Sequence, residues 1–193
     1  WPFGLLSFFF LIYFQSDIIM LMYLSGGDFA GIYSAACLLL TVVYLLPGVV
    51  YQKYLLPKFH YWANHDQKYF YTFYKTGNFV MLALGMFVMV LLWQYSDRAI
   101  LIFFGEKYQD AVPIIKVLSI AVPIHLIIMS VGSVLITHDA RLKLKYMGIA
   151  TIVNIVLNFI LRPFFEAFGA AVATVASDLI LLMLYFHAAN NIF

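Results

Sequence analysis

Two aspartates stand inside long apolar stretches of this sequence, where an ionised side chain is costly to bury. Asp17 lies within one such stretch, and Asp178 lies within another, with Thr174 one helical turn before it. Tyr13, one turn before Asp17 on the same helical face, is placed to donate a hydrogen bond to that carboxylate. A carboxylate in an apolar environment is neutral, paired or in contact with water. Both aspartates are therefore candidates for binding a polar substrate or a coupling ion.

Polar side chains also recur at helical spacing toward the end of the sequence. Separations of three, four and four residues place them in one stripe on a helix: Thr151, Asn154, Asn158 and Arg162. Such amide and hydroxyl groups either bind sugar hydroxyls or hold neighbouring membrane helices together. For Arg162 a third interpretation is open, because a long basic side chain can extend to the membrane surface.

Three tyrosines share one face of another predicted helix, because Tyr44 and Tyr51 follow Tyr33 by 11 and 18 residues. They form either an aromatic belt at the membrane surface or the lining of a cavity. His125 lies in an apolar stretch just after a proline, and we interpret it as a core histidine rather than a ligand. The candidate residues for binding a substrate or a coupling ion are Asp17, Tyr33, Tyr44, Asn154, Asn158, Arg162 and Asp178.

Several other kinds of chemistry have no support in the sequence. It contains no motif of a hydrolase nucleophile elbow, a zinc protease or a P-loop. Its single cysteine, Cys37, excludes a disulfide framework within the chain, and its net charge of +2 does not indicate nucleic-acid binding. We therefore predict no catalytic residue, no metal site, no cofactor and no nucleic-acid partner.

The composition indicates the class of protein that must position these residues. Of the 193 residues, 65% are hydrophobic and 10% are charged, whereas soluble domains are about half apolar and about a quarter charged. A spanning helix needs about 20 mostly apolar residues. Six stretches qualify: residues 2–24, 29–55, 71–93, 111–136, 144–161 and 164–189. The expected fold is an all-α membrane protein whose six transmembrane helices form one domain over residues 1–193.

Basic residues are unevenly divided between the connections. The connection over residues 53–75 and the one over residues 141–145 together hold seven of the 11 Lys and Arg residues. If the helices alternate in direction, both connections lie on the same side, which should be cytoplasmic, and both ends of the chain face that side too. Basic and aromatic residues are mixed over residues 58–75, which predicts a segment at the level of the lipid headgroups.

Local breaks complete the expected layout. Residues 25–28, Ser-Gly-Gly-Asp, predict a tight turn, after which Asp28 caps the second helix and small residues allow close packing. Residues 97–111 predict a short interfacial helix that ends at Gly105. Pro47 and Pro123 each remove a backbone hydrogen bond and are expected to bend their helices.

Three stretches of this sequence resemble a known family. Residues 16–39, SDIIMLMYLSGGDFAGIYSAACLL, are similar to the seventh-to-eighth helix region of bacterial polysaccharide flippases of the O-antigen type. That region has an Asp in the helix, a Gly-containing turn and a G-x-Y-x-A-A pattern. Residues 101–123 resemble the family's Phe-Gly-x-x-Tyr-x-x-Ala stretch, and residues 150–178 resemble its Asn-x-x-x-Asn, Pro and Gly-Ala-Ala pattern. The segment over residues 162–171 departs from the family's shorter Ile-Pro-x-x-Gly turn.

This resemblance implies membership of the superfamily of multidrug, oligosaccharidyl-lipid and polysaccharide exporters. Its members have about twelve helices in two six-helix lobes around a central cavity. The chain then corresponds to the C-terminal lobe, and we expect it to be part of a longer chain that includes the N-terminal lobe. The implied function is a flippase that moves a lipid-linked oligosaccharide of the polyprenyl-diphosphate type across the bacterial cytoplasmic (inner) membrane. Such a flippase serves the biosynthesis of polysaccharides such as lipopolysaccharide O-antigen.

Two other functions stay open. A multidrug and toxin extrusion antiporter of the same superfamily would exchange a coupling ion for a cationic drug at a membrane carboxylate, and Asp17 and Asp178 fit that role too. The polar stripe over residues 151–162 favours a sugar cavity over the apolar, acidic site that a drug needs. A membrane-embedded enzyme of glycan assembly would need long catalytic loops, and the connections in this sequence are short.

Overall fold

The computed structural model describes residues 2–191, and every secondary-structure element within that range is helical. The elements are α1 (Pro2–Leu24), α2 (Gly27–Val50), a π-helical segment (Tyr51–Leu55), α3 (Leu56–His65), α4 (Gln67–Phe104), a short 3₁₀ turn (Glu106–Tyr108), α5 (Ala111–Ser119), α6 (Ala121–His138) and α7 (Ala140–Asn190). The all-α class predicted from the sequence is confirmed over this range. Trp1 and residues 192–193 of the predicted domain lie outside it.

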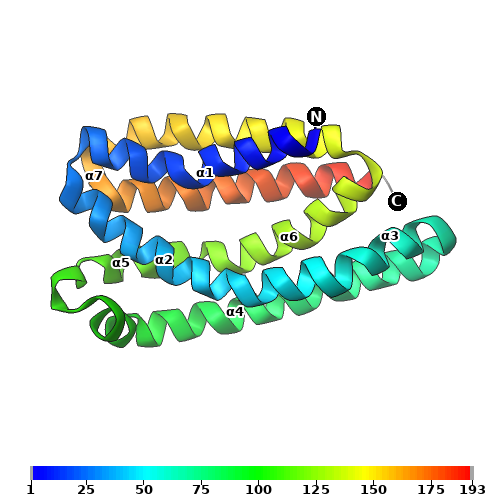
Figure 1. Ribbon diagram of the computed structural model, residues 1–193, viewed down its shortest axis with the longest axis horizontal. Helices are drawn as coiled ribbons and strands as arrows, with labels where there is room; N and C mark the ends of the chain where they lie inside the picture. The colour runs from blue at the N-terminus through cyan, green and yellow to red at the C-terminus, as the bar shows by residue number, and fades with distance from the viewer. Residues whose placement is uncertain (1, 192–193) are drawn as a thin grey trace.

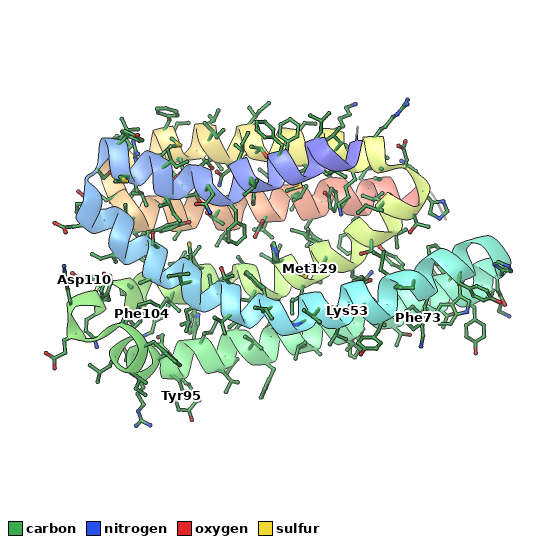
Figure 2. The ribbon with its side chains drawn as sticks, viewed as in Figure 1. Lys53, Phe73, Tyr95, Phe104, Asp110 and Met129 are labelled. Carbon is green, nitrogen blue, oxygen red and sulfur yellow. The ribbon has the colours of Figure 1, made fainter. Side chains whose placement is uncertain are left out.

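Within residues 2–191, five of the helical stretches are long and apolar enough to cross a membrane. They are Gly4–Leu24, Gly27–Lys58, Lys68–Phe104, Ala121–His138 and Ala140–Asn190. Their outer faces carry large apolar side chains: Tyr95 of α4, for example, is 49% exposed and points away from the other helices (Figure 2). A surface of this kind is stable in lipid rather than in water.

The last helix, α7, is folded back on itself. A straight helix of 51 residues would be roughly 77 Å long at its usual rise, more than twice the ~30 Å of a hydrocarbon core. Glu166 breaks the helix with φ 50° and ψ −126°, and the two arms run in opposite directions in Figure 1. We call residues 140–165 the first arm of α7 and residues 167–190 its second arm. The reversal therefore lies a few residues after the boundary at residues 162–163 that the sequence predicts, and Pro163 is accommodated within the helix.

Gly169 allows this reversal to be tight. A Cβ atom at this position would lie 2.8 Å from the carbonyl oxygen of Leu161, which is closer than real Cβ contacts. Only glycine lets the beginning of the second arm approach the end of the first arm this closely.

The two ends of the bundle differ in their connections (Figure 1). The beginning of α1, the end of α7, α3 and the turn between α6 and α7 lie at one end. The turn between α1 and α2, the segment between α4 and α5 and the reversal of α7 lie at the other end. Helix α3, the central part of the basic segment over residues 53–75, and the turn next to residues 141–145 therefore lie at the same end as the beginning of α1 and the end of α7.

Two predicted elements in the middle of the chain differ from the structure. Residues 97–104 continue α4 instead of forming a separate interfacial helix, because no glycine or proline lies between Gly85 and Gly105, which ends α4 with φ 82°. The stretch predicted as one helix over residues 111–136 is divided at Ile120 into α5 and α6. Pro123 explains this division, because it has no N–H to donate to the carbonyl four residues earlier.

The second helix also begins and ends differently from the prediction. Gly26 occupies the N-cap position with φ 107°, so that Asp28, which we expected as the cap, lies in the first turn of α2. A carboxylate there still faces the positive end of the helix dipole. Pro47 does not end α2, which continues to Val50 and then widens into the π-helical segment. Among the small residues of this helix, Ala35 and Ala36 are buried, whereas a side chain at Gly31 would meet open space.

Candidate functional site

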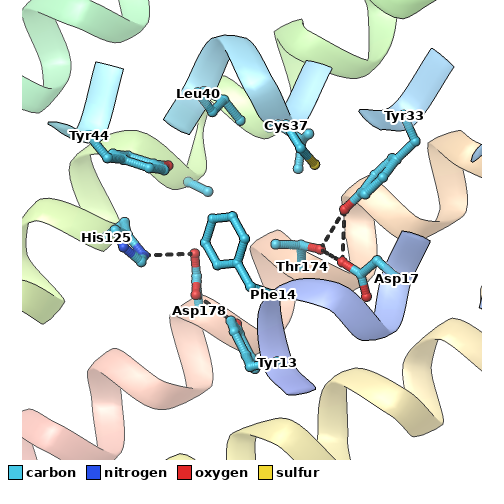
Figure 3. Close-up of a pocket in the computed structure, with 12 residues that line it drawn as sticks. Tyr13, Phe14, Asp17, Tyr33, Cys37, Leu40, Tyr44, His125, Thr174 and Asp178 are labelled. Carbon is cyan, nitrogen blue, oxygen red and sulfur yellow. Dashed lines mark hydrogen bonds and ion pairs between the residues drawn. The ribbon is translucent and has the colours of Figure 1, made fainter. Parts of the chain in front are cut away.

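Two buried carboxylates face one small cavity between α1, α2, α5, α6 and α7 (Figure 3). Its volume is about 40 Å³. Polar groups gather in two clusters, each of which contributes side chains to its wall. The Asp17 cluster consists of Asp17, Tyr33, Asn158 and Thr174. The Asp178 cluster consists of Tyr13, His125 and Asp178.

In the Asp17 cluster the carboxylate accepts hydrogen bonds from three helical segments. Tyr33 of α2 donates its hydroxyl to Oδ2 over 2.8 Å, and Thr174 of the second arm of α7 donates to the same oxygen over 2.6 Å. Asn158 of the first arm donates its Nδ2 to Oδ1 over 2.8 Å. Asp17 is only 4% exposed, and all three donors are neutral. The negative charge at this position is therefore hydrogen-bonded, but within the described chain no cation forms an ion pair with it.

The Asp178 cluster joins α1, α6 and the second arm of α7. The Tyr13 hydroxyl donates to Oδ1 of Asp178 over 2.7 Å, and Nδ1 of His125 lies 3.9 Å from Oδ2 of the same carboxylate. The ring of Tyr44 lies against the His125 imidazole, with 4.5 Å between the centroids. The prediction that Tyr13 donates to Asp17 is therefore wrong. Tyr13 contacts a carboxylate on another helix because the second arm of α7 packs beside α1.

The polar stripe on the first arm of α7 packs against α1 rather than lining the cavity. Asn154 and Asn158 are fully buried: Ser16 donates to Asn154 Oδ1 over 3.2 Å, and Asn158 reaches the cavity only through Asp17. Arg162 is buried as well, and its Nη1 donates to the backbone carbonyl of Met20. The structure thus favours the helix-packing interpretation of the stripe over the sugar-binding one, and it contradicts an extension of Arg162 to the membrane surface.

The predicted site residues therefore fall into two groups. Four of them line the cavity directly: Asp17, Tyr33, Tyr44 and Asp178. The other three lie behind it: Asn154, Asn158 and Arg162. The third tyrosine of the predicted face, Tyr51, donates to Ser130 Oγ of α6 over 3.0 Å and does not line the cavity.

For two residues of the site, the structure differs from the interpretation that the sequence pattern favours. Thr174 was paired with Asp178 by helical spacing, yet its hydroxyl contacts Asp17. His125 was interpreted as a core histidine, yet its ring lines the cavity and faces Asp178. The spacing of Tyr33 and Tyr44 was a usable signal for the cavity, because both tyrosines do line it. The position of His125 on the same wall depends on the packing of α6 against α2.

The dimensions of the cavity limit what it can hold. A single water molecule needs about 10–15 Å³ of such volume, whereas pockets for drug-sized ligands have volumes of about 300–1,000 Å³. The site therefore has room for a few water molecules or a small ion, but not for a sugar ring.

Two buried amide atoms next to the Asp17 cluster lack a hydrogen-bond partner in the described chain, namely Nδ2 of Asn154 and Oδ1 of Asn158. Unsatisfied buried polar atoms are rare and often mark the place of a bound water or ion. The described residues contain no group of three or more His, Cys, Asp or Glu side chains that could together hold a metal ion.

Comparison of this chain with known protein families, with curated proteins and with solved structures finds no match.

Proposed function

We propose that this chain is one lobe of an ion-coupled membrane transporter, and that the transporter is a flippase for lipid-linked oligosaccharides. The observation that carries the proposal is Asp17, a buried carboxylate held only by neutral donors beside a cavity of about 40 Å³. A membrane bundle gains no stability from such a group, because its burial costs more than an apolar residue would. Asp17 is therefore assigned to binding and releasing a coupling ion.

The hydrogen bonds of Asp17 give the ion a route to affect the rest of the lobe. They connect α1 with α2 and with both arms of α7. An ion that binds at the carboxylate competes for the same oxygen lone pairs as Tyr33, Asn158 and Thr174. Binding and release would therefore shift the packing of these helices, which is the kind of change that alternating access requires.

The identity of the cargo rests on the family resemblance. Since the cavity has no room for a sugar, the oligosaccharide would pass between this lobe and a second lobe. The headgroup would be shielded from hydrocarbon there while the polyprenyl tail stays among the membrane lipids. If each arm of α7 crosses the membrane, the described residues supply six spanning segments, the number that this architecture needs. The basic end of the bundle supports an orientation with both ends of this chain in the bacterial cytoplasm.

A second candidate is a multidrug and toxin extrusion antiporter. It is favoured by the finding that the polar stripe forms internal hydrogen bonds, which removes the main sequence argument for a sugar site. Carboxylates and aromatic rings such as Phe14 and Tyr44 around one cavity suit a small cation as well. The two candidates differ in cargo, and a transport experiment separates them.

The test is complementation of a deletion strain with the full-length gene. The Asp17→Asn variant should abolish surface polysaccharide and cause lipid-linked oligosaccharide to accumulate in the inner membrane, at normal protein abundance. Asp28→Asn is the matched control, because Asp28 is exposed at the start of α2, and it should complement fully. Normal polysaccharide in the deletion strain would refute the flippase, and drug sensitivity of that strain would identify the antiporter instead.

A further inference from the structure

The ion-coupling role of Asp17 leaves the second carboxylate of the cavity unexplained. Asp178 is only 3% exposed, lies in the second arm of α7, and faces the same cavity beside His125 (Figure 3). It cannot serve only as a structural acceptor for Tyr13, because a neutral side chain could accept that hydrogen bond without the cost of a buried charge.

The two oxygens of Asp178 have different partners. Oδ1 accepts the short hydrogen bond from Tyr13, at 2.7 Å. Oδ2 faces Nδ1 of His125 at 3.9 Å, which is too long for a direct hydrogen bond but short enough for an ion pair once the imidazole is protonated. His125 keeps 14% of its side chain exposed and lines the cavity, so water in the cavity can reach the ring.

The remaining groups that face the cavity supply no positive charge. The titratable residues on its wall are Tyr13 and Asp17 from α1, Tyr33, Cys37 and Tyr44 from α2, His125 from α6 and Asp178 from α7. The contribution of α5 is Leu118, and the described lining contains no lysine or arginine. With a neutral imidazole the wall therefore carries two carboxylates and no cation.

We infer that His125 and Asp178 form a proton-binding site that shares the cavity with the ion site at Asp17. The imidazole takes a proton from a hydronium ion in the cavity, which leaves water; it becomes an imidazolium paired with Oδ2 of Asp178, and it returns the proton to water on release. Histidine is the side chain whose charge changes near neutral pH. One proton on His125 and one coupling ion at Asp17 together neutralise both carboxylates, so the doubly loaded cavity is the electrically neutral one.

This inference rests on the proposed function only for its role in transport. The protonation of His125 is a property of the cavity, and it can be measured on the purified full-length protein whether or not the protein moves a glycan. The two claims can therefore fail separately.

The experiment is nitrogen NMR of the ¹⁵N-histidine-labelled full-length protein in lipid nanodiscs. The His125→Gln variant identifies the His125 signals by their loss. In the unmodified protein these signals should change from those of neutral imidazole to those of imidazolium within the range of about pH 5 to pH 9. The Asp178→Asn variant removes the carboxylate that faces Nδ1 of His125, and it should change the His125 signals from those of the unmodified protein. The control is His187→Gln, which changes an exposed histidine of α7 and should leave the His125 signals unchanged.

Two results would overturn the inference: a His125 ring that keeps one protonation state over this range, or His125 signals that Asp178→Asn does not change. If Asp178→Asn fails to fold, the titration of the unmodified protein decides. In proteoliposomes, His125→Gln should reduce the response of glycan movement to a proton gradient at least tenfold. If the His125 ring changes its protonation state but no glycan moves, the flippase is refuted and the proton site stands. If glycan moves but the ring keeps one protonation state, the proton site is refuted and the flippase stands.

Discussion

Replacing Asp17 by asparagine separates the charge of this residue from its hydrogen bonds. The carboxamide oxygen can take the position of Oδ2, where it still accepts from Tyr33 and Thr174, whose hydroxyls lie 2.8 and 2.6 Å from that atom. The new amino group then faces Asn158, whose Oδ1 has no partner among the described atoms. Rotation of the Asn158 amide turns this contact into a hydrogen bond, at the expense of its bond to the Asn154 carbonyl at 3.0 Å.

The expected change in stability is the difference between two terms of similar size. A hydrogen bond to a charged acceptor contributes about 1.5–3 kcal/mol and one to a neutral acceptor about 0.5–1.5 kcal/mol, so three weakened bonds cost roughly 3 kcal/mol. Removing the buried charge recovers a desolvation penalty of several kcal/mol. We therefore expect the free energy of unfolding of Asp17→Asn to stay within about 2 kcal/mol of the parental value.

Asp17→Ala removes the acceptor altogether and should cost more. Thr174 keeps a bond to the Ala170 carbonyl and Asn158 keeps its bond to Asn154, but the Tyr33 hydroxyl retains only Thr174 Oγ, at 3.1 Å. The desolvation penalty is recovered here as well, but the three hydrogen bonds are lost instead of weakened and the side chain leaves a void, so the expected loss is about 2–4 kcal/mol.

The assay is denaturant unfolding of the purified full-length variants in detergent, together with polysaccharide export at matched abundance. Asp17→Asn should keep its stability and lose export, whereas Asp17→Ala should lose both. An asparagine variant less stable than the alanine variant would refute the account of the hydrogen bonds. Export at the parental rate in both variants would remove Asp17 from the mechanism.

Three further predictions concern the fold, the orientation and the transport unit. Gly169→Ala should lower the free energy of unfolding by about 1–3 kcal/mol, because a methyl group would contact the Leu161 carbonyl, while Gly31→Ala, which meets open space, should be neutral or slightly stabilising. A cysteine at Lys68 should resist a membrane-impermeant reagent in intact cells and one at Asp28 should react, and the opposite pattern would invert the proposed orientation. Reconstituted alone, this chain should not transport, because the proposed cargo path needs a second lobe; transport by the chain as a monomer would contradict that architecture.

The apolar stretches of the sequence were sufficient to predict an all-helical chain whose outer surface suits lipid rather than water. Hydropathy and length are properties of the chain itself. A long apolar run such as residues 2–24 can satisfy its backbone hydrogen bonds in lipid only as a helix. The same applies to the buried aspartates: Asp17 and Asp178 could be identified as unusual because their neighbours in sequence are apolar, whatever the fold. Helical spacing was also enough to place Tyr33 and Tyr44 on one face.

Only the tertiary structure decided which of these groups meet. Helical spacing put Tyr13 beside Asp17 and Thr174 beside Asp178, yet each hydroxyl donates to the other aspartate. Spacing along one helix determines the face on which a side chain lies, but not which helix packs against that face. That choice depends on the reversal of α7 at Glu166. The sequence predicts a boundary a few residues earlier, but it does not mark Glu166 as the residue that turns, because residues other than glycine rarely adopt a positive φ. The reversal brings the second arm of α7 beside α1, and this contact makes two isolated aspartates into one site.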